Sequence, residues 1–307
     1  MSVVQRLAER GIARPPKFLP SNTHYETLMG SVAYGVSGDT SDTDVYGFCI
    51  PPKEEVFPHL RGEIVGFGTP LPRFAQYQQH HLKDPDALAG AGRDYDLTIY
   101  NIVDYLHLLM KNNPNIIDSL FAPSECVLHI TRIGQMVRDA RKTFLHKGSW
   151  HTFKGYAYQQ VTKMVGHERT GKRKEVVEKF GFDVKFAYHV VRLLNEAEQI
   201  LTEGDLDLMR NREQLKSIRR GEWTAQQVRD YFTKKEAELE TLYQTSKLQY
   251  GPDEGAVKQL LLNCLEEHYG SLEKCVVNPD AAVTALREVA AVLERYGRGS
   301  DKSFQHP

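Results

Sequence analysis

Two aspartates one residue apart stand in the stretch GSVAYGVSGDTSDTDVYGFCIPP, residues 30–52, just before an apolar run. In a strand, side chains alternate between the faces and rise about 3.3 Å per residue, so Asp42 and Asp44 would project from one face roughly 6 to 7 Å apart, with Val45 turned to the core. Two carboxylates held in this way repel each other unless a cation lies between them. Oxygen ligands of this kind suit Mg²⁺ or Mn²⁺, which complete their shells with water and substrate phosphates. The pair therefore predicts a metal site.

A glycine and a serine, Gly30 and Ser31, precede the aspartates at the end of a predicted strand. Because glycine has no Cβ, backbone N–H groups and the serine hydroxyl can approach a phosphate closely there. Together with the aspartate pair, this turn predicts a site for a metal-bound nucleotide. Tyr34, inside the same turn, could stack on a base or pack under the sheet.

The aspartates also allow a plainer interpretation, which is a turn held by Asx hydrogen bonds. An EF-hand loop that starts at Asp42 is excluded, because its fifth position is Tyr46 and its twelfth is Lys53. A Walker-type phosphate loop is excluded too, since the sequence contains no G-x-x-x-x-G-K-[ST] motif.

The composition restricts the class of protein in which this site lies. The chain has 307 residues, 41% of them hydrophobic, and a formal net charge of −1, so any attraction to nucleic acid or membrane must be local. There is no signal-peptide pattern at the N-terminus and no apolar run long enough to span a membrane. Four cysteines lie far apart without a C-x-x-C pair and are typical of reduced thiols: Cys49, Cys126, Cys264 and Cys275. We expect a soluble, cytoplasmic protein without a membrane partner.

Hydrophobic periodicity divides the chain into two parts. Up to about residue 125, short apolar runs alternate with turns, which is typical of an α/β domain. From Ile130 onward the apolar spacing is helical, over residues 130–145, 184–201, 228–242, 256–265 and 281–293. We predict an α/β domain over 1–125 and an all-α domain over 126–307, with the boundary near Phe121-Ala-Pro-Ser124 and a disordered tail over 297–307.

The segment from Lys53 to Arg93 fits neither pattern, because it is long, weakly periodic and rich in Pro, Gly, His and Gln. Such a segment is either an irregular flap over an active site or an insertion.

The array Gly30-Ser31, then Ser41-Asp42-Thr43-Asp44 before an apolar strand, resembles the signature of the DNA polymerase beta nucleotidyltransferase superfamily. More closely, the run G-S-x-A-Y-G through S-D-T-D-x-x-G-F, with DYDLTIY, KNNPNIIDSLF and DVKFAYHVVRLL, looks like the predicted nucleotidyltransferase family of bacteria and phages associated with RNA repair. The likeness covers most of residues 25–245. It implies a small mixed sheet with helices followed by a helical domain, nucleotide contacts from Gly30, Ser31 and Ser41, and transfer of a nucleotidyl group from an NTP.

This resemblance requires a third carboxylate on a neighbouring strand, and DYDLTIY offers two. Leu97 and Ile99 must face the core, which places Asp94, Asp96 and Thr98 together on the opposite face, so parity cannot separate the two aspartates. The resemblance favours Asp96, which adjoins the apolar strand.

The resemblance also assigns roles to the three carboxylates. Asp42 and Asp44 would bridge two metal ions, which in such sites lie about 3.5 to 4 Å apart. Asp96 would bind the ion that activates the attacking hydroxyl and could accept its proton.

Three basic side chains form a stripe in the helical part. Lys185, His189 and Arg192 fall at i, i+4 and i+7 between apolar stripes, so the stripe should meet either acidic partners or a polyanion in a cleft. We expect it to bind the NTP triphosphate; salt bridges to the other domain are the alternative. A second basic group, between Lys163 and Lys179, follows three aromatic residues and suits single-stranded RNA, although such loops are usually just solvated.

The sequence thus favours a nucleotidyltransferase that uses two Mg²⁺ or Mn²⁺ ions to transfer NMP from an NTP to an acceptor hydroxyl, with an RNA end, including that of tRNA, as the expected acceptor. Protein nucleotidylation and a nucleotide-binding regulatory module without turnover are the alternatives. The presence of all three carboxylates favours an enzyme.

Overall fold

The structure is a computed structural model that describes residues 1–36, 43–165, 172–272, 285–286 and 288–293. Ser41, Asp42, Cys275 and the tail 297–307 therefore lie outside the described residues.

A five-stranded mixed sheet in the order β3-β4-β2-β1-β5 lies at the centre of the first part. The strands are β1 (Thr23–Leu28), β2 (Thr43–Cys49), β3 (Gln76–Asp84), β4 (Arg93–Asn101) and β5 (Val127–Ile130). Strands β2 and β4 are parallel. Strand β1 pairs antiparallel with both β2 and β5, and β3 pairs antiparallel with β4. This arrangement confirms the expected mixed sheet with helices, followed by a helical region.

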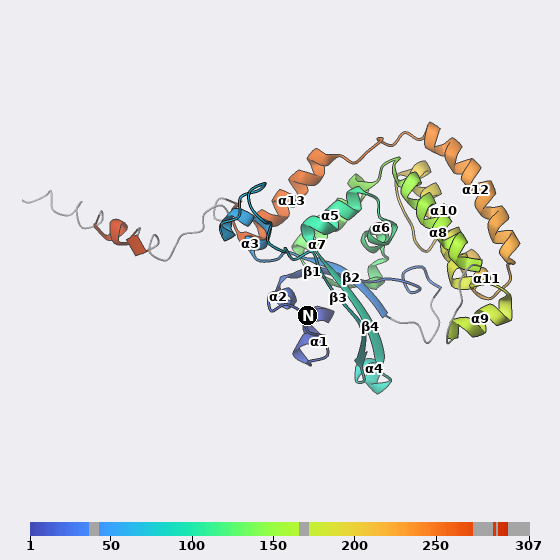
Figure 1. Cartoon of the computed structure of the whole chain (residues 1–307), viewed down its shortest axis with the longest axis horizontal. Helices are drawn as coiled ribbons and strands as arrows, with labels where there is room; N and C mark the ends of the chain where they lie inside the picture. The colour runs from blue at the N-terminus through green and yellow to red at the C-terminus, as the bar shows by residue number, and fades with distance from the viewer. Residues whose placement is uncertain (37–42, 166–171, 273–284, 287, 294–307) are drawn as a thin grey trace, which may run out of the picture.

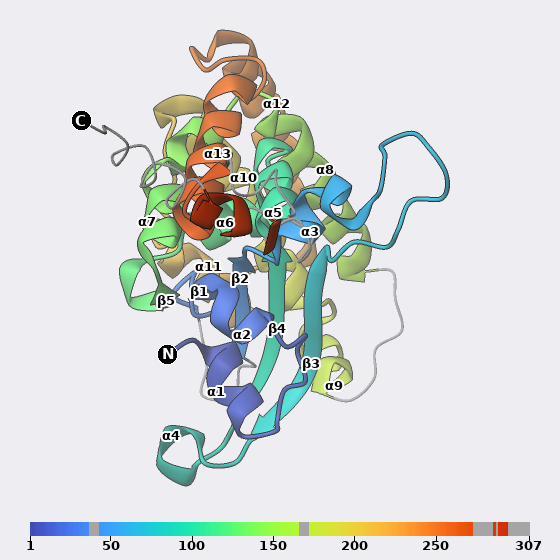
Figure 2. The same cartoon turned by 90° about the vertical axis from the view of Figure 1, so that its left-hand side faces the viewer.

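One face of the sheet is covered by two N-terminal helices, α1 (Val3–Glu9) and α2 (Leu19–Asn22), as Figure 2 shows. Val45, Leu97 and Ile99 point to this side and form a fully buried cluster with residues of α1. The strand parity expected from the sequence is therefore confirmed, and Asp44 and Asp96 face the other side of the sheet.

The opposite face packs against helices that surround the larger core. These helices are α5 (Ile102–Met110), α6 (Pro114–Phe121), α7 (Arg132–Asp139) and α13 (Glu254–Tyr269). Asn101 and Asn113 cap α5 and α6, and Pro114 stands in the first turn of α6, where its missing N–H costs nothing. Figure 1 shows α13 returning from the helical part to lie near α5 and α7, both of which it contacts.

The helical part is built around α10 (Val184–Glu203), which packs between α8 and α12 (Figure 1). Its other members are α8 (Ser149–Val165), α9 (Lys172–Phe180), α11 (Arg212–Arg219) and α12 (Ala225–Thr245). Asp183 caps the start of α10, and Gly204, at φ +60°, ends it in the left-handed conformation that glycine adopts most readily. The expected helices over 184–201, 228–242 and 256–265 are confirmed, whereas 281–293 lies only partly within the described residues.

Two strands differ from the sequence expectation. β3 lies inside the segment 53–93, so this segment is not wholly irregular: besides β3 it holds α3 (Lys53–Val56), the 3₁₀ turn Pro58–Arg61 and α4 (Ala87–Gly90). β5 lies beyond residue 125 and completes the sheet next to β1, within the part predicted to be all helical. The helix expected over 130–145 is confirmed in part, as α7 followed by the 3₁₀ turn Arg141–Phe144; a further 3₁₀ turn occupies Ser124–Cys126. The division into domains at 125/126 stays a prediction.

Cys49, Cys126 and Cys264 are buried free thiols. Within the described part of the chain, no helix combines the length and apolarity needed to cross a membrane.

Candidate active site

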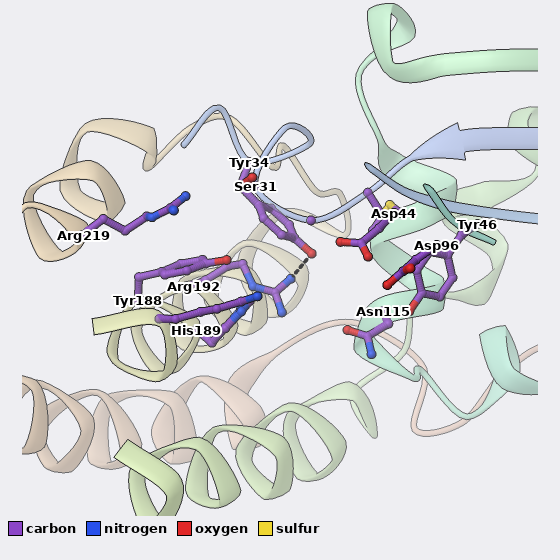
Figure 3. A pocket seen from close by; sticks show the side chains of 13 residues that line it. Ser31, Tyr34, Asp44, Tyr46, Asp96, Asn115, Tyr188, His189, Arg192 and Arg219 are labelled. Atoms are coloured by element: carbon purple, nitrogen blue, oxygen red, sulfur yellow. Dashed lines mark hydrogen bonds between the residues drawn. The ribbon is translucent and has the colours of Figure 1, made fainter. Parts of the chain in front are cut away.

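A cavity of about 430 Å³ opens between the sheet and the helical part. On the sheet side, the lining residues come from the turn that follows β1 (Met29, Gly30, Ser31 and Tyr34) and from β2 and β4 (Asp44, Tyr46 and Asp96). On the helical side, they come from α10 (Lys185, Tyr188, His189 and Arg192) and α11 (Arg219). Asn115 of α6 completes the lining. Figure 3 shows the two carboxylates on the sheet side and His189, Arg192 and Arg219 on the helical side. Of the expected site residues, Ser41 and Asp42 lie outside the described residues, and all the others line this cavity.

The two described carboxylates are direct neighbours across the sheet. Asp44 on β2 is the register partner of Asp96 on β4, and adjacent strands lie about 4.8 Å apart. Of the two aspartates in DYDLTIY, Asp96 lines the cavity, whereas Asp94 is exposed and pairs in register with Lys83.

The backbone of the Gly30 turn lies directly against Asp44. A Cβ at Gly30 would stand 2.5 Å from Asp44 Oδ2, and Gly30 has φ +69°, so only glycine fits this position without strain. A carboxylate pair cradled by backbone and open to a cavity has the hard oxygen donors that Mg²⁺ or Mn²⁺ prefers. Among the described residues, no group of three or more His, Cys, Asp or Glu side chains could hold a metal. Asp42, the first aspartate of the expected pair, lies outside the described residues. The two carboxylates present fit a divalent cation.

Tyr46 lies beside these carboxylates on the floor of the cavity. Burial, helped by the neighbouring Tyr100, Asp44 and Asp96, raises the pKa of the Tyr46 phenol to about 12. Tyr46 therefore stays a neutral hydroxyl and adds no charge to the site.

Arg192 is almost fully buried and already has acidic partners. Its guanidinium forms an ion pair with Asp118 of α6 and a longer one, at 3.3 Å, with Glu196. It also donates to Tyr34 Oη at 2.5 Å and stacks 4.3 Å from the centroid of the Tyr34 ring (Figure 3). Tyr34 in turn donates to Asp118 Oδ2 at 2.7 Å, so the turn, α6 and α10 are joined in one network.

Two carboxylates in this network share one guanidinium. Burial raises the pKa of both Asp118 and Glu196, and the nearby Arg192 guanidinium opposes this shift in each of them. Arg192 thus matches the salt-bridge alternative for the basic stripe, while its role as a nucleotide contact stays a prediction.

The other two members of the stripe, Lys185 and His189, also line the cavity. Lys185 is exposed, and the His189 ring lies 4.1 Å from that of Tyr188. Arg219 of α11 donates to the carbonyl of Val36 and lies 5.5 Å from the Tyr188 ring centroid, so it ties α11 to the turn after β1.

Sequence reasoning missed several lining residues. Asn115 lies in the segment KNNPNIIDSLF, which carried the family resemblance. Arg219 lies in the basic segment Lys216–Arg220, which from the sequence is a weaker candidate for RNA contact and not for this cavity. Of the three aromatics before the second basic group, Tyr158 is exposed, whereas Phe153 is in the core and the Tyr156 hydroxyl accepts from Asn113 at 2.9 Å.

The site combines neighbouring carboxylates on a mixed sheet, a glycine turn packed against one of them and a facing helical region with basic side chains. This is the arrangement that the resemblance to DNA polymerase beta nucleotidyltransferases implied. The model of the RNA repair pathway DNA polymerase beta family, RlaP, matches residues 7–266, and the chain belongs to this family.

No curated protein matches the sequence. Among solved structures, the chain is similar to a nucleotidyltransferase-like protein from Exiguobacterium sibiricum 255-15, at 9% identity and a TM-score of 0.28, over 79% of this chain and 73% of that one.

Proposed function

We propose that this protein transfers NMP from an NTP to an acceptor hydroxyl at an RNA end. The observation that carries the proposal is the pairing of Asp44 and Asp96 on adjacent strands, with Gly30 packed against Asp44, at a cavity whose far side is basic. The family to which the chain belongs supports RNA as the acceptor.

In this reaction the acceptor oxygen forms a bond to the α-phosphorus, and the bond from that phosphorus to the oxygen of the β-phosphate breaks, releasing pyrophosphate. Two Mg²⁺ or Mn²⁺ ions, held by Asp44, Asp96 and Asp42, would stabilise the charge on the attacking and leaving oxygens. Asp96 would accept the proton of the attacking hydroxyl, directly or through water.

The other residues of the cavity bind and position the NTP. Backbone N–H groups and the hydroxyl at Gly30-Ser31 contact phosphate oxygens, and Lys185 and His189 approach the triphosphate from the helical side. Arg192 holds Tyr34, and with it the turn, in place through the network with Asp118.

The test is transfer of radioactive label from each of the four NTPs, labelled either at the α- or at the γ-phosphate, to a pool of RNAs or to cell proteins. We expect label on RNA from the α-position only, and none with Asp44→Asn. Label on protein would instead establish the nucleotidylation alternative. Tight NTP binding without transfer to either class would establish the regulatory alternative.

A further inference from the structure

Strand β3 has a β-bulge directly beside Asp96. Gln79 is opposite Leu97 and Leu82 is opposite Tyr95, so two residues of β3, His80 and His81, stand against Asp96 alone. Bulges of this two-against-one kind are common next to active sites, where they redirect a side chain or a backbone group.

The bulge directs two nitrogen atoms at the carboxylate of Asp96. The backbone N–H of His81 donates to Asp96 Oδ1 at 2.7 Å, and His80 Nδ1 lies 3.3 Å from Asp96 Oδ2. His81 has φ +55°, a conformation that residues other than glycine adopt in only a few per cent of cases. Backbone strain of this kind tends to persist at functional sites.

We propose that His80 is a positioning residue that, together with the His81 amide, holds Asp96 in the orientation needed to bind a metal ion beside Asp44. The inference rests on the proposed function of the site. Carboxylates that ligate metals are themselves commonly fixed by hydrogen bonds, and loss of such a partner typically lowers metal affinity or activity 10- to 100-fold. A ring N–H at His80 Nδ1 supplies such a bond to Oδ2, and the His81 amide supplies one to Oδ1.

The position of His80 argues against a role in folding. Its side chain is 48% exposed on the edge strand of the sheet, so its removal opens no cavity in the core. If loss of the His80 side chain lowers metal binding and kcat but leaves the stability of the protein unchanged, then His80 positions Asp96 and does not stabilise the fold.

The experiment compares three variants of the full chain, His80→Ala, His80→Asn and Lys83→Ala, by Mn²⁺ binding in electron paramagnetic resonance and by kcat and KM for NTP. Asparagine keeps a donor near the position of Nδ1, and Lys83 is an exposed residue of β3 opposite Asp94. We expect His80→Ala to lower Mn²⁺ affinity and kcat about 10- to 100-fold with KM changed less than about threefold, and His80→Asn to recover most of the loss. Lys83→Ala should behave as the unmodified protein.

Wild-type Mn²⁺ affinity and kcat in His80→Ala would overturn the inference, as would equal defects in His80→Ala and Lys83→Ala, or no recovery in His80→Asn. Asp96→Asn separates this result from failure of the proposed function. If Asp96→Asn loses Mn²⁺ binding and transfer while His80→Ala loses neither, only the role of His80 is wrong. If Asp96→Asn keeps both, the proposed site itself is wrong.

Discussion

Gly30 and Asp44 are in such close contact that a Cβ at Gly30 would stand 2.5 Å from Asp44 Oδ2. The turn after β1 and the carboxylate on β2 therefore fix each other's positions. Since Gly30 also has φ +69°, a larger side chain meets both a steric clash with the carboxylate and an unfavourable backbone conformation.

Gly30→Ala should therefore reduce nucleotidyl transfer by about 100-fold or more, because it displaces Asp44. Gly62→Ala is the matched control: Gly62 has φ +77°, but a Cβ there would meet nothing within 4 Å. Both variants should lose about 1–2 kcal/mol of stability in urea unfolding, and only Gly30→Ala should lose transfer. Equal activity in the two variants would show that the contact with Asp44 is unimportant.

Replacement of Asp44 or Asp96 by Asn should lower transfer by about 100-fold or more, because each change removes a charged oxygen ligand from the site. Melting temperatures should stay close to that of the unmodified protein, since neither side chain is in the core. Asp94 is exposed on the same face of β4, and Asp94→Asn should lower transfer only mildly. A severe Asp94 defect beside an active Asp96 variant would reverse their assignment.

Arg192 and Lys185 should give opposite phenotypes although they lie on one stripe of α10. Arg192→Ala leaves the buried Asp118 without its cation and should cost about 3–5 kcal/mol of unfolding free energy. Lys185→Ala removes an exposed cation at the cavity and should weaken NTP binding about tenfold to a hundredfold, with little change in stability.

Urea unfolding and NTP calorimetry on both α10 variants measure the two effects. A stable Arg192→Ala protein with weakened NTP binding would make Arg192 a direct nucleotide contact instead.

His24 should make the fold sensitive to acid. Burial, with the nearby His268 and His129, lowers the pKa of His24 to about 4, compared with 6.5 for an unperturbed histidine. The unfolded chain then binds more protons than the folded one between these values, so stability is lost as pH falls from 6.5 towards 4. At pH 5, His24 should account for about 2 kcal/mol of this loss relative to pH 8.

His24→Gln should flatten the pH dependence by that amount in urea unfolding. His24 bonds to Thr131 and to His268 of α13, at 2.9 and 3.0 Å, so the change has a structural cost as well. For this reason the comparison is between pH values within each protein. An identical pH dependence in the two proteins would exclude His24 as the titrating group.

The sequence predicted those parts of the fold in which hydrophobic spacing is strong. β2 and β4 bury Val45, Leu97 and Ile99 on one face, and α10 buries most of its length, so their patterns are clear. β3 was missed because the inward face of QYQQHHLKD carries only two apolar residues, Tyr77 and Leu82, and because the bulge at His80-His81 shifts the alternation between them. β5 has only four residues, too few to give a pattern against the helix that follows.

The candidate site was predictable where chemistry is encoded locally. Gly30, Asp44 and Asp96 stand in short motifs, and the stripe of α10 follows from helical spacing. The partners of these residues could not be predicted. Asp118 is 74 positions away from Arg192 along the chain, and His81 is 15 positions away from Asp96. The sequence around Arg192 does not indicate which carboxylate will pair with it, and the sequence around Asp96 does not indicate which backbone amide will bond to it.

The place of β5 in the sheet has a consequence for how the chain can be divided. β5 covers the outer edge of β1, yet its residues follow α6 and lead directly into α7. A fragment that ends at residue 125 would leave the backbone N–H and C=O groups along that edge of β1 without partners, and open edges of this kind recruit other chains and aggregate. The sheet and the helices that face it are therefore not separable modules, because a fragment cut at this point contains only four of the five strands.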